Sequence, residues 1–332
     1  MFLLGVDIKS VKDYVGADWS AVVERISCAL KSDIALLNST NDTILSHSGK
    51  QLRPLLALLL ARACAAGQTT EATIRYAASA ELLHNATLLH DDVADDSEQR
   101  RGVPTIMSLM GPAVSVLVGD YWLVKAMELI LGEGEGDTRV IRIFSKTLSD
   151  LAEGEMLQLQ KAQNGDTDQD DYLRIIYNKT ASLFEAACLS AAVSVKAPAE
   201  YEKAAKDYSV ALGLAFQIKD DILDYDGTES VGKPLGVDIL EQKITMPLLG
   251  AMANAGEAEE KRVRALVKDI AGHPEYRDEI VAFVKQNGGL EYAAQVLGKY
   301  VDEAVKALEV FPESYEKDCL KALAYFTAKR KM

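Results

Sequence analysis

LLHDDVADDSEQRRG, at residues 88–102, holds four aspartates within six positions and then two adjacent arginines. The stretch ends an apolar run whose composition is typical of a helix. Asp91 and Asp95 are four residues apart, so we expect them to project from one helix face, with Asp92 and Asp96 on the next stripe. Negative charges near a helix C-terminus are opposed by the helix dipole and by one another. The stretch therefore predicts a cationic partner.

A second aspartate-rich stretch, FQIKDDILD at residues 216–224, repeats the DDxxD pattern and again follows an apolar, helical run. We expect the two stretches to face each other. Carboxylate oxygens suit magnesium, which proteins commonly hold through one or two carboxylates together with substrate phosphates. The pair of stretches predicts that this protein binds a diphosphate bridged by magnesium.

The chain has 332 residues and a formal net charge of −14, which argues against nucleic acid as a partner. Its four cysteines lie far apart without CxxC spacing. This predicts neither a zinc site nor a disulfide framework and favours a reduced, cytoplasmic location. The first residues, MFLLGV, carry no basic residue, and no apolar stretch approaches the ~20 residues that span a bilayer. We therefore expect neither a signal peptide nor a transmembrane helix.

The eight prolines fall at the edges of segments whose apolar residues recur with the period of a helix. We expect helices over residues 19–37, 54–66, 70–90, 115–131, 138–163, 168–195, 201–223, 243–255, 257–270, 276–286, 290–308 and 313–329. Glycine-rich breaks between them are too short to link domains. The pattern predicts an all-α fold, with residues 1–332 forming a single helical domain.

A diphosphate site also needs cations beside its metal. GKQLRP, at residues 49–54, places Lys50 and Arg53 at a helix start, where backbone N–H groups also favour an anion. His84 is a candidate donor to a phosphate oxygen. The remaining candidate cations are Arg100, Arg101, Lys179, Lys233 and Lys243.

The motifs G-K-x-x-R-P, H-x6-D-D-x-x-D-x4-R-R-G, E-G-E, K-T, F-Q-x-x-D-D-x-x-D and K-P-x-G-x-D-x4-K follow one another over residues 49–243. This ordered set resembles the trans-isoprenyl diphosphate synthases, also called polyprenyl synthetases. The resemblance implies an all-α bundle around a central cavity, a homodimer, and head-to-tail condensation of an allylic diphosphate, farnesyl diphosphate or similar, with isopentenyl diphosphate. It also implies three Mg²⁺ ions, for which Mn²⁺ can substitute.

The resemblance assigns roles residue by residue. The direct magnesium ligands would be Asp91, Asp95 and Asp220, supported by Asp92, Asp221 and Asp224. The allylic diphosphate would be held by Arg100, Lys179, Lys233 and Lys243, with Thr180 and Gln217 beside it. Isopentenyl diphosphate would be bound by Lys50, Arg53, His84 and Arg101. Within these sets, the catalytic residues would be Asp91, Asp92, Asp95, Arg100, Lys179, Thr180, Gln217, Asp220 and Lys233.

The resemblance also implies that product length depends on the helix that precedes Asp91, beside which the growing chain would run. Thr87 and Ala86, four and five residues before Asp91, are small, whereas short-chain members of the family carry aromatic residues there. We therefore expect a long product, of roughly thirty to fifty carbons, for a quinone side chain. The deeper residues that would set its limit are Leu82, Leu83 and Ser79.

Three other functions stay open at this point. A short-chain synthase, making farnesyl or geranylgeranyl diphosphate, is disfavoured only by the small residues before Asp91. A terpene cyclase would have no use for Lys50, Arg53 and Arg101. A non-catalytic subunit of a heteromeric synthase would have no reason to keep two complete carboxylate clusters. Residues 329–331 (KRK) are interpreted as a solvated tail, and a basic terminus that closes over the diphosphates stays open as the alternative. Peripheral membrane contact for product release also stays open.

Overall fold

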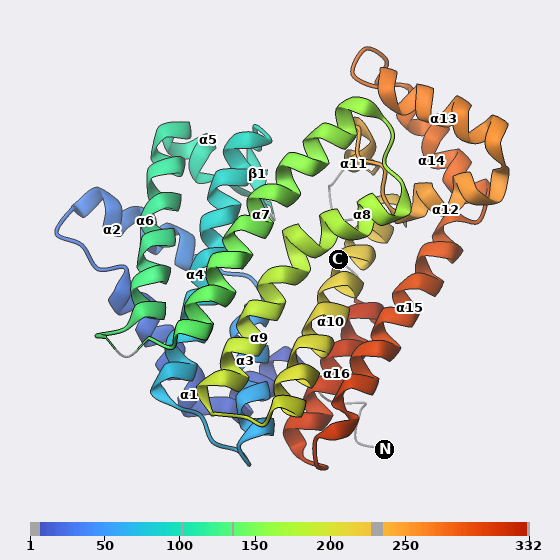
Figure 1. The fold of residues 1–332 in the computed structure, drawn as a ribbon. Helices are drawn as coiled ribbons and strands as arrows, with labels where there is room; N and C mark the ends of the chain where they lie inside the picture. The colour runs from blue at the N-terminus through green and yellow to red at the C-terminus, as the bar shows by residue number, and fades with distance from the viewer. Residues whose placement is uncertain (1–6, 101, 135, 227–234, 331–332) are drawn as a thin grey trace. The chain divides into compact units, whose positions relative to one another are not determined.

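The computed structural model describes residues 7–100, 102–134, 136–226 and 235–330, and these are almost entirely helical (Figure 1). A two-residue antiparallel hairpin, β1 (Gln99–Arg100) with β2 (Val103–Pro104), accompanies the helices. The helices are α1 (Ile8–Ala29), α2 (Ala35–Ser46), α3 (Leu52–Cys64), α4 (Glu71–Ala94), α5 (Ile106–Met110), α6 (Pro112–Leu131), α7 (Thr138–Asn164), α8 (Gln169–Ile176), α9 (Ser182–Ser194), α10 (Ala199–Asp226), α11 (Val237–Leu240), α12 (Met246–Ala255), α13 (Glu257–Asp269), α14 (Tyr276–Gln286), α15 (Gly289–Ala307) and α16 (Tyr315–Lys329). The all-α prediction is confirmed.

Two predicted helices are not continuous α-helices in the structure. The helix expected over residues 19–37 is wrong, because α1 ends at Ala29 and α2 begins at Ala35. The Asn38 side chain accepts from the Ser32 backbone N–H and donates to the Ser32 carbonyl, and such local bonds compete with helix formation. The helix expected over residues 168–195 is interrupted by a π-helical turn, Tyr177–Ala181, between α8 and α9.

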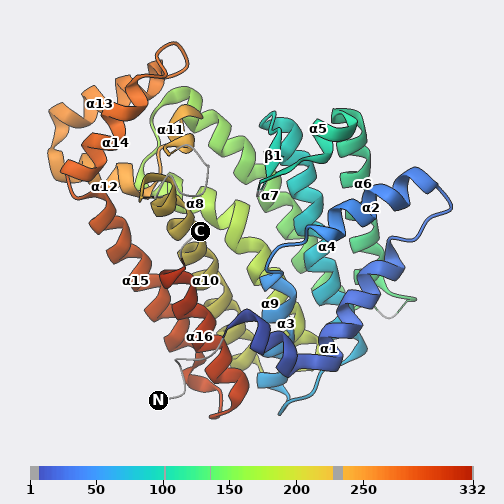
Figure 2. The same ribbon diagram turned by 180° about the vertical axis from the view of Figure 1, so that it is seen from behind.

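By its internal contacts the chain divides into two compact units, and the first comprises residues 1–145, 186–205 and 310–320. Its centre is α4, which packs against α6, α3 and α1; Figures 1 and 2 show the α4 and α6 ribbons side by side. Residues 54–61 of helix α3 are all apolar, and they are buried around the whole circumference of the helix. Burial of this kind explains why α3 lies within the core of its unit.

The second unit comprises residues 146–185, 206–309 and 321–332. Within it α12 packs against α13, α14 and α15, and α8 also touches α12 (Figure 2). Proline at the start of α12 suits the first helical turn, where no N–H partner is needed. The assignment of the whole chain to one domain stays a prediction. In the part of the chain that the structure describes, no helix has the length and apolarity to cross a membrane.

Candidate active site

The first aspartate block lies where α4 ends. Asp91 is in the last turn and half-buried, whereas Asp95 is the exposed residue that caps the helix. Asp96 follows with a positive φ of 49°, in the left-handed region that aspartate tolerates. The expected stripe of Asp92 and Asp96 is therefore wrong, because the helix stops before Asp96. Asp95 is still joined to the last turn, because its backbone N–H donates to the Asp91 carbonyl.

Asp92 is buried and pairs with the first of the two arginines. Arg100 Nε lies 2.8 Å from Asp92 Oδ1. Burial raises the pKa of Asp92, and the Arg100 guanidinium partly offsets that effect. Both side chains line a cavity of about 100 Å³ at the end of α4. The predicted cationic partner of this block is thus present in the hairpin strand β1.

Lys179 and Thr180 lie on the π-helical turn between α8 and α9. Such turns are frequent at functional sites, because the extra residue displaces side chains from the regular helical positions. Gly154 of α7 permits a close approach there, since a Cβ at Gly154 would lie 2.6 Å from the Cβ of Asn178. The neighbouring Glu155 carboxylate lies 2.5 Å from Lys179 Nζ. The E-G-E motif therefore brings a carboxylate to this lysine.

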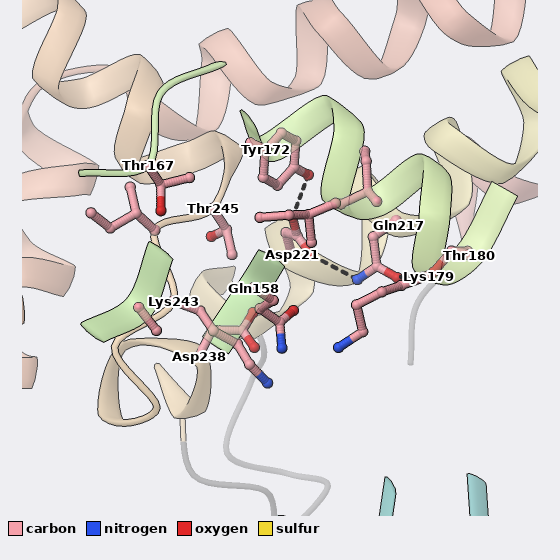
Figure 3. Close-up of a pocket in the computed structure, with 14 residues that line it drawn as sticks. Gln158, Thr167, Tyr172, Lys179, Thr180, Gln217, Asp221, Asp238, Lys243 and Thr245 are labelled. Atoms are coloured by element: carbon pink, nitrogen blue, oxygen red, sulfur yellow. Dashed lines mark hydrogen bonds between the residues drawn. The ribbon is translucent and has the colours of Figure 1, made fainter. Parts of the chain in front are cut away.

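A hydrogen-bonded chain crosses from the π-helical turn to α10. The Thr180 hydroxyl donates to Gln217 Oε1 at 2.8 Å, and Gln217 Nε2 donates to Asp221 Oδ1 at 3.0 Å. The buried Tyr172 hydroxyl donates to the other oxygen of Asp221 (Figure 3). Burial raises the pKa of Asp221 well above its ordinary value.

These side chains line one cavity of about 140 Å³, shown in Figure 3. Gln158, Asp238 and Lys243 contribute to its wall as well. Burial and the nearby Asp224 carboxylate raise the pKa of Asp238 to about 7. The cavity therefore combines cationic, carboxylate, amide and hydroxyl groups, as recognition of a polar, anionic ligand requires.

The other two aspartates of the second block have different partners. Arg330, which follows α16, lies with Nη2 2.7 Å from Asp220 Oδ1. Its guanidinium also covers the Phe216 ring at 3.9 Å and is almost fully buried. The solvated-tail interpretation is therefore wrong for Arg330, and Lys331 lies outside the described residues. Asp224 accepts from the first backbone N–H groups of α11, at 3.1 Å and 3.2 Å, and so caps that helix.

The remaining predicted substrate-binding residues divide into two groups. Lys50 is exposed just before α3, Arg53 is half-buried in its first turn, and His84 is half-buried on α4. Because α3 packs on α4, Arg53 and His84 belong to adjacent helices of one unit, and Lys50 immediately precedes the first of these helices. Arg101 and Lys233 lie outside the described residues.

The residues expected to control product length lie on the buried length of α4. Ala86, Leu82 and Leu83 are fully buried, and the half-buried Thr87 donates its hydroxyl to the His84 carbonyl at 2.8 Å. Ser79, which shares a helix face with Ala86, donates to the Ala126 carbonyl of α6 at 3.2 Å. Ala86 therefore lies on the side of α4 that meets α6.

The donor set fits magnesium. Among the described residues, no group of three acidic, histidine or cysteine side chains is close enough to hold a metal ion by itself. Magnesium keeps several waters and completes its shell with substrate phosphates, so one or two carboxylates at each block are sufficient. Asp91, Asp95 and Asp220 would provide them, but that the two blocks face each other stays a prediction.

Sequence reasoning assigned no catalytic or binding role to four residues that the structure places beside predicted ones. They are Glu155, Tyr172, Asp238 and Arg330. Two of them stand inside motifs already noted, E-G-E and K-P-x-G-x-D. Tyr172 and Arg330 carry no motif signal, because their importance depends on contacts with residues far along the chain.

The chain belongs to the polyprenyl synthetase family, whose model matches residues 34–284. It is 35% identical to the octaprenyl diphosphate synthase of Escherichia coli, over 98% of this chain and 99% of that protein. It is 36% identical to an all-trans-nonaprenyl-diphosphate synthase of Rhodobacter capsulatus, over 92% of this chain and 93% of that protein.

Two solved structures show the same all-α fold. One is a decaprenyl diphosphate synthase from Rhodobacter capsulatus, with a TM-score of 0.87 and 37% identity over 97% of this chain and 99% of that one. The other is a polyprenyl synthase from Caulobacter crescentus complexed with calcium and isoprenyl diphosphate, with a TM-score of 0.88 and 34% identity over 98% of both chains.

Proposed function

We propose that this protein is an all-trans polyprenyl diphosphate synthase that condenses an allylic diphosphate with isopentenyl diphosphate and depends on magnesium. The observation that carries the proposal is the cavity in which Lys179, Thr180, Gln217 and Lys243 converge beside the second DDxxD block. Family membership over most of the chain supports it. A terpene cyclase would share the carboxylates but would not need Lys50 and Arg53.

The roles of the residues follow from charge. Magnesium would stabilise the negative charge that builds on the departing diphosphate. Lys179 and Lys243 would bind the same diphosphate, so that the allylic C–O bond ionises and leaves a delocalised carbocation. The alkene of isopentenyl diphosphate would then attack that carbocation. The released diphosphate would take the proton, because no side chain in the motifs is an obvious base.

We propose that the product is long, of roughly thirty to fifty carbons and suited to a quinone side chain. Ala86 supports this length, because it is small and fully buried on α4. The octaprenyl, nonaprenyl and decaprenyl synthases that resemble this chain support it as well. Cytoplasmic location, and membrane contact at product release, stay predictions.

The test is the product profile of purified protein with magnesium, radiolabelled isopentenyl diphosphate and farnesyl diphosphate, resolved by chain length. We expect products beyond C25. Termination at C20 would contradict the long-chain assignment but keep the condensation. Absence of any product would favour a non-catalytic subunit and overturn the proposed function.

We also propose a homodimer that forms through α6. Leu117, Val124 and Leu131 are spaced by seven residues, so they lie on one face of α6, and their exposed fractions are 66%, 50% and 46%. An apolar stripe of this kind is typical of an interaction surface. Val124→Glu should yield monomers in analytical ultracentrifugation, whereas Val310→Glu, which also places an acid at an exposed valine, should not. A Val124→Glu protein that stays dimeric would contradict the α6 interface.

A further inference from the structure

Tyr172 is a buried tyrosine whose hydroxyl group has a specific acceptor. Its exposed fraction is 3%, and it lies on α8, seven residues before Lys179. The hydroxyl donates to Asp221 Oδ2, and Asp221 itself is only 2% exposed. A buried carboxylate is costly unless its oxygens are hydrogen-bonded, so this contact is needed to keep Asp221 where it is.

The Asp221 carboxylate in turn determines how Gln217 is oriented. Asp221 Oδ1 accepts from Gln217 Nε2 at 3.0 Å, which turns the amide carbonyl away from the carboxylate. The reverse orientation would bring two oxygens together. Gln217 Oε1 is then available to the Thr180 hydroxyl, which donates to it at 2.8 Å.

This chain of donors also orients Thr180. Because the Thr180 hydroxyl donates its proton to Gln217, the lone pairs of the hydroxyl oxygen are directed away from Gln217. Thr180, Gln217 and Lys179 line the same cavity. An oxygen that presents lone pairs can stabilise the positive charge that develops when an allylic C–O bond ionises.

We propose that Tyr172 is a positioning residue for this ionisation, acting through Asp221 to hold the Gln217 amide and the Thr180 hydroxyl in one orientation. The inference rests on the proposed function, since it names the reaction that the orientation serves. Tyr172 lines the cavity but carries no charge, and its hydroxyl donates to Asp221 (Figure 3). It should therefore affect the chemical step more than binding.

The test is Tyr172→Phe, which removes the hydroxyl group and keeps the ring. We expect kcat to fall about 10-fold, as loss of one buried hydrogen bond predicts, with KM for both diphosphates within about 2-fold. Tyr177→Phe is the matched control. Its hydroxyl donates to Glu185 at 2.8 Å from the neighbouring π-helical turn, so it should keep kcat within about 2-fold of wild type.

A double variant separates positioning from a purely structural effect. If Tyr172 acts through Gln217, Tyr172→Phe should lower kcat less than about 2-fold in a Gln217→Leu background. A full 10-fold loss in that background would overturn the proposal, as would wild-type kcat in the single variant. A rise in KM with unchanged kcat would also overturn it. If wild-type protein forms no product at all, the proposed function fails and the role of Tyr172 fails with it.

Discussion

Arg330 pairs with Asp220, so an aspartate proposed to bind magnesium already has a cationic partner within the chain. The guanidinium is nearly buried and 2.7 Å from Asp220 Oδ1, and it also covers Phe216. The Asp220 side chain is 43% exposed, so solvent screens the pair. A divalent ion that binds Asp220 must compete with this guanidinium or share the carboxylate with it.

We predict that Arg330→Gln tightens magnesium binding. Removing a partly screened ion pair should lower the half-saturating magnesium concentration about 3-fold. Isothermal titration with magnesium and a diphosphate analogue measures the change directly. Arg330→Lys keeps the positive charge and serves as the control. An unchanged or weaker affinity in Arg330→Gln would show that the ion pair does not compete with metal.

We predict that Asp91 is required for turnover and Asp96 is not. Asp91→Ala should lower kcat more than about 100-fold at saturating magnesium, because a direct ligand is lost. Asp96→Asn also removes one negative charge from the block, and asparagine accepts the positive φ at that position. It should retain near wild-type activity. Near-full turnover by Asp91→Ala would refute the metal assignment.

We predict that Ala86→Tyr shortens the product. A tyrosine in place of this fully buried alanine would fill the space beside α4 and stop elongation earlier, by at least one five-carbon unit. Chain-length analysis of the products measures the effect. Ala72→Tyr, at the other end of the same helix, should leave the distribution unchanged. Because overpacking can destabilise the protein, thermal unfolding of both variants is compared, and an unchanged product profile in folded Ala86→Tyr would contradict the prediction.

The raised pKa of Asp238 predicts that the stability of the metal-free protein depends on pH. Its pKa is about 7 in the folded chain, against about 3.9 in an unfolded one. Between these values the folded chain binds more protons at this site, so the stability that the group contributes below pH 4 is lost as the pH rises through 7.

Asp238→Asn removes the titrating carboxyl group and therefore the loss of stability as the pH rises through 7. With a chelator present, the variant should unfold at a higher temperature than wild type at pH 8, and the difference should shrink toward pH 5. Asp302→Asn is the control, because it makes the same charge change at an exposed aspartate of α15. A difference that does not depend on pH would contradict the assignment.

The sequence alone was sufficient to predict the all-α fold. It also singled out the two aspartate blocks and Lys179, Thr180 and Gln217, three residues that the structure places around one cavity. The reason is local: helical periodicity, proline and glycine positions and short charged motifs act over a few residues. The predicted helix ends were less accurate than the predicted fold. The break after α1 depends on side-chain bonds of Asn38, and α4 continues four residues beyond His90 despite its charged end.

Only the tertiary structure decided which side chains contact the residues of the motifs. Tyr172 reaches Asp221 across 49 residues of sequence, and Arg330 reaches Phe216 across 114. No periodicity reports such a contact, because it depends on how α8, α10 and the segment after α16 pack together. The sequence by itself thus determined the all-α fold and which residues are candidates for the chemistry. The packing determined which of their oxygens and nitrogens are already engaged, and therefore which side chains act by positioning others.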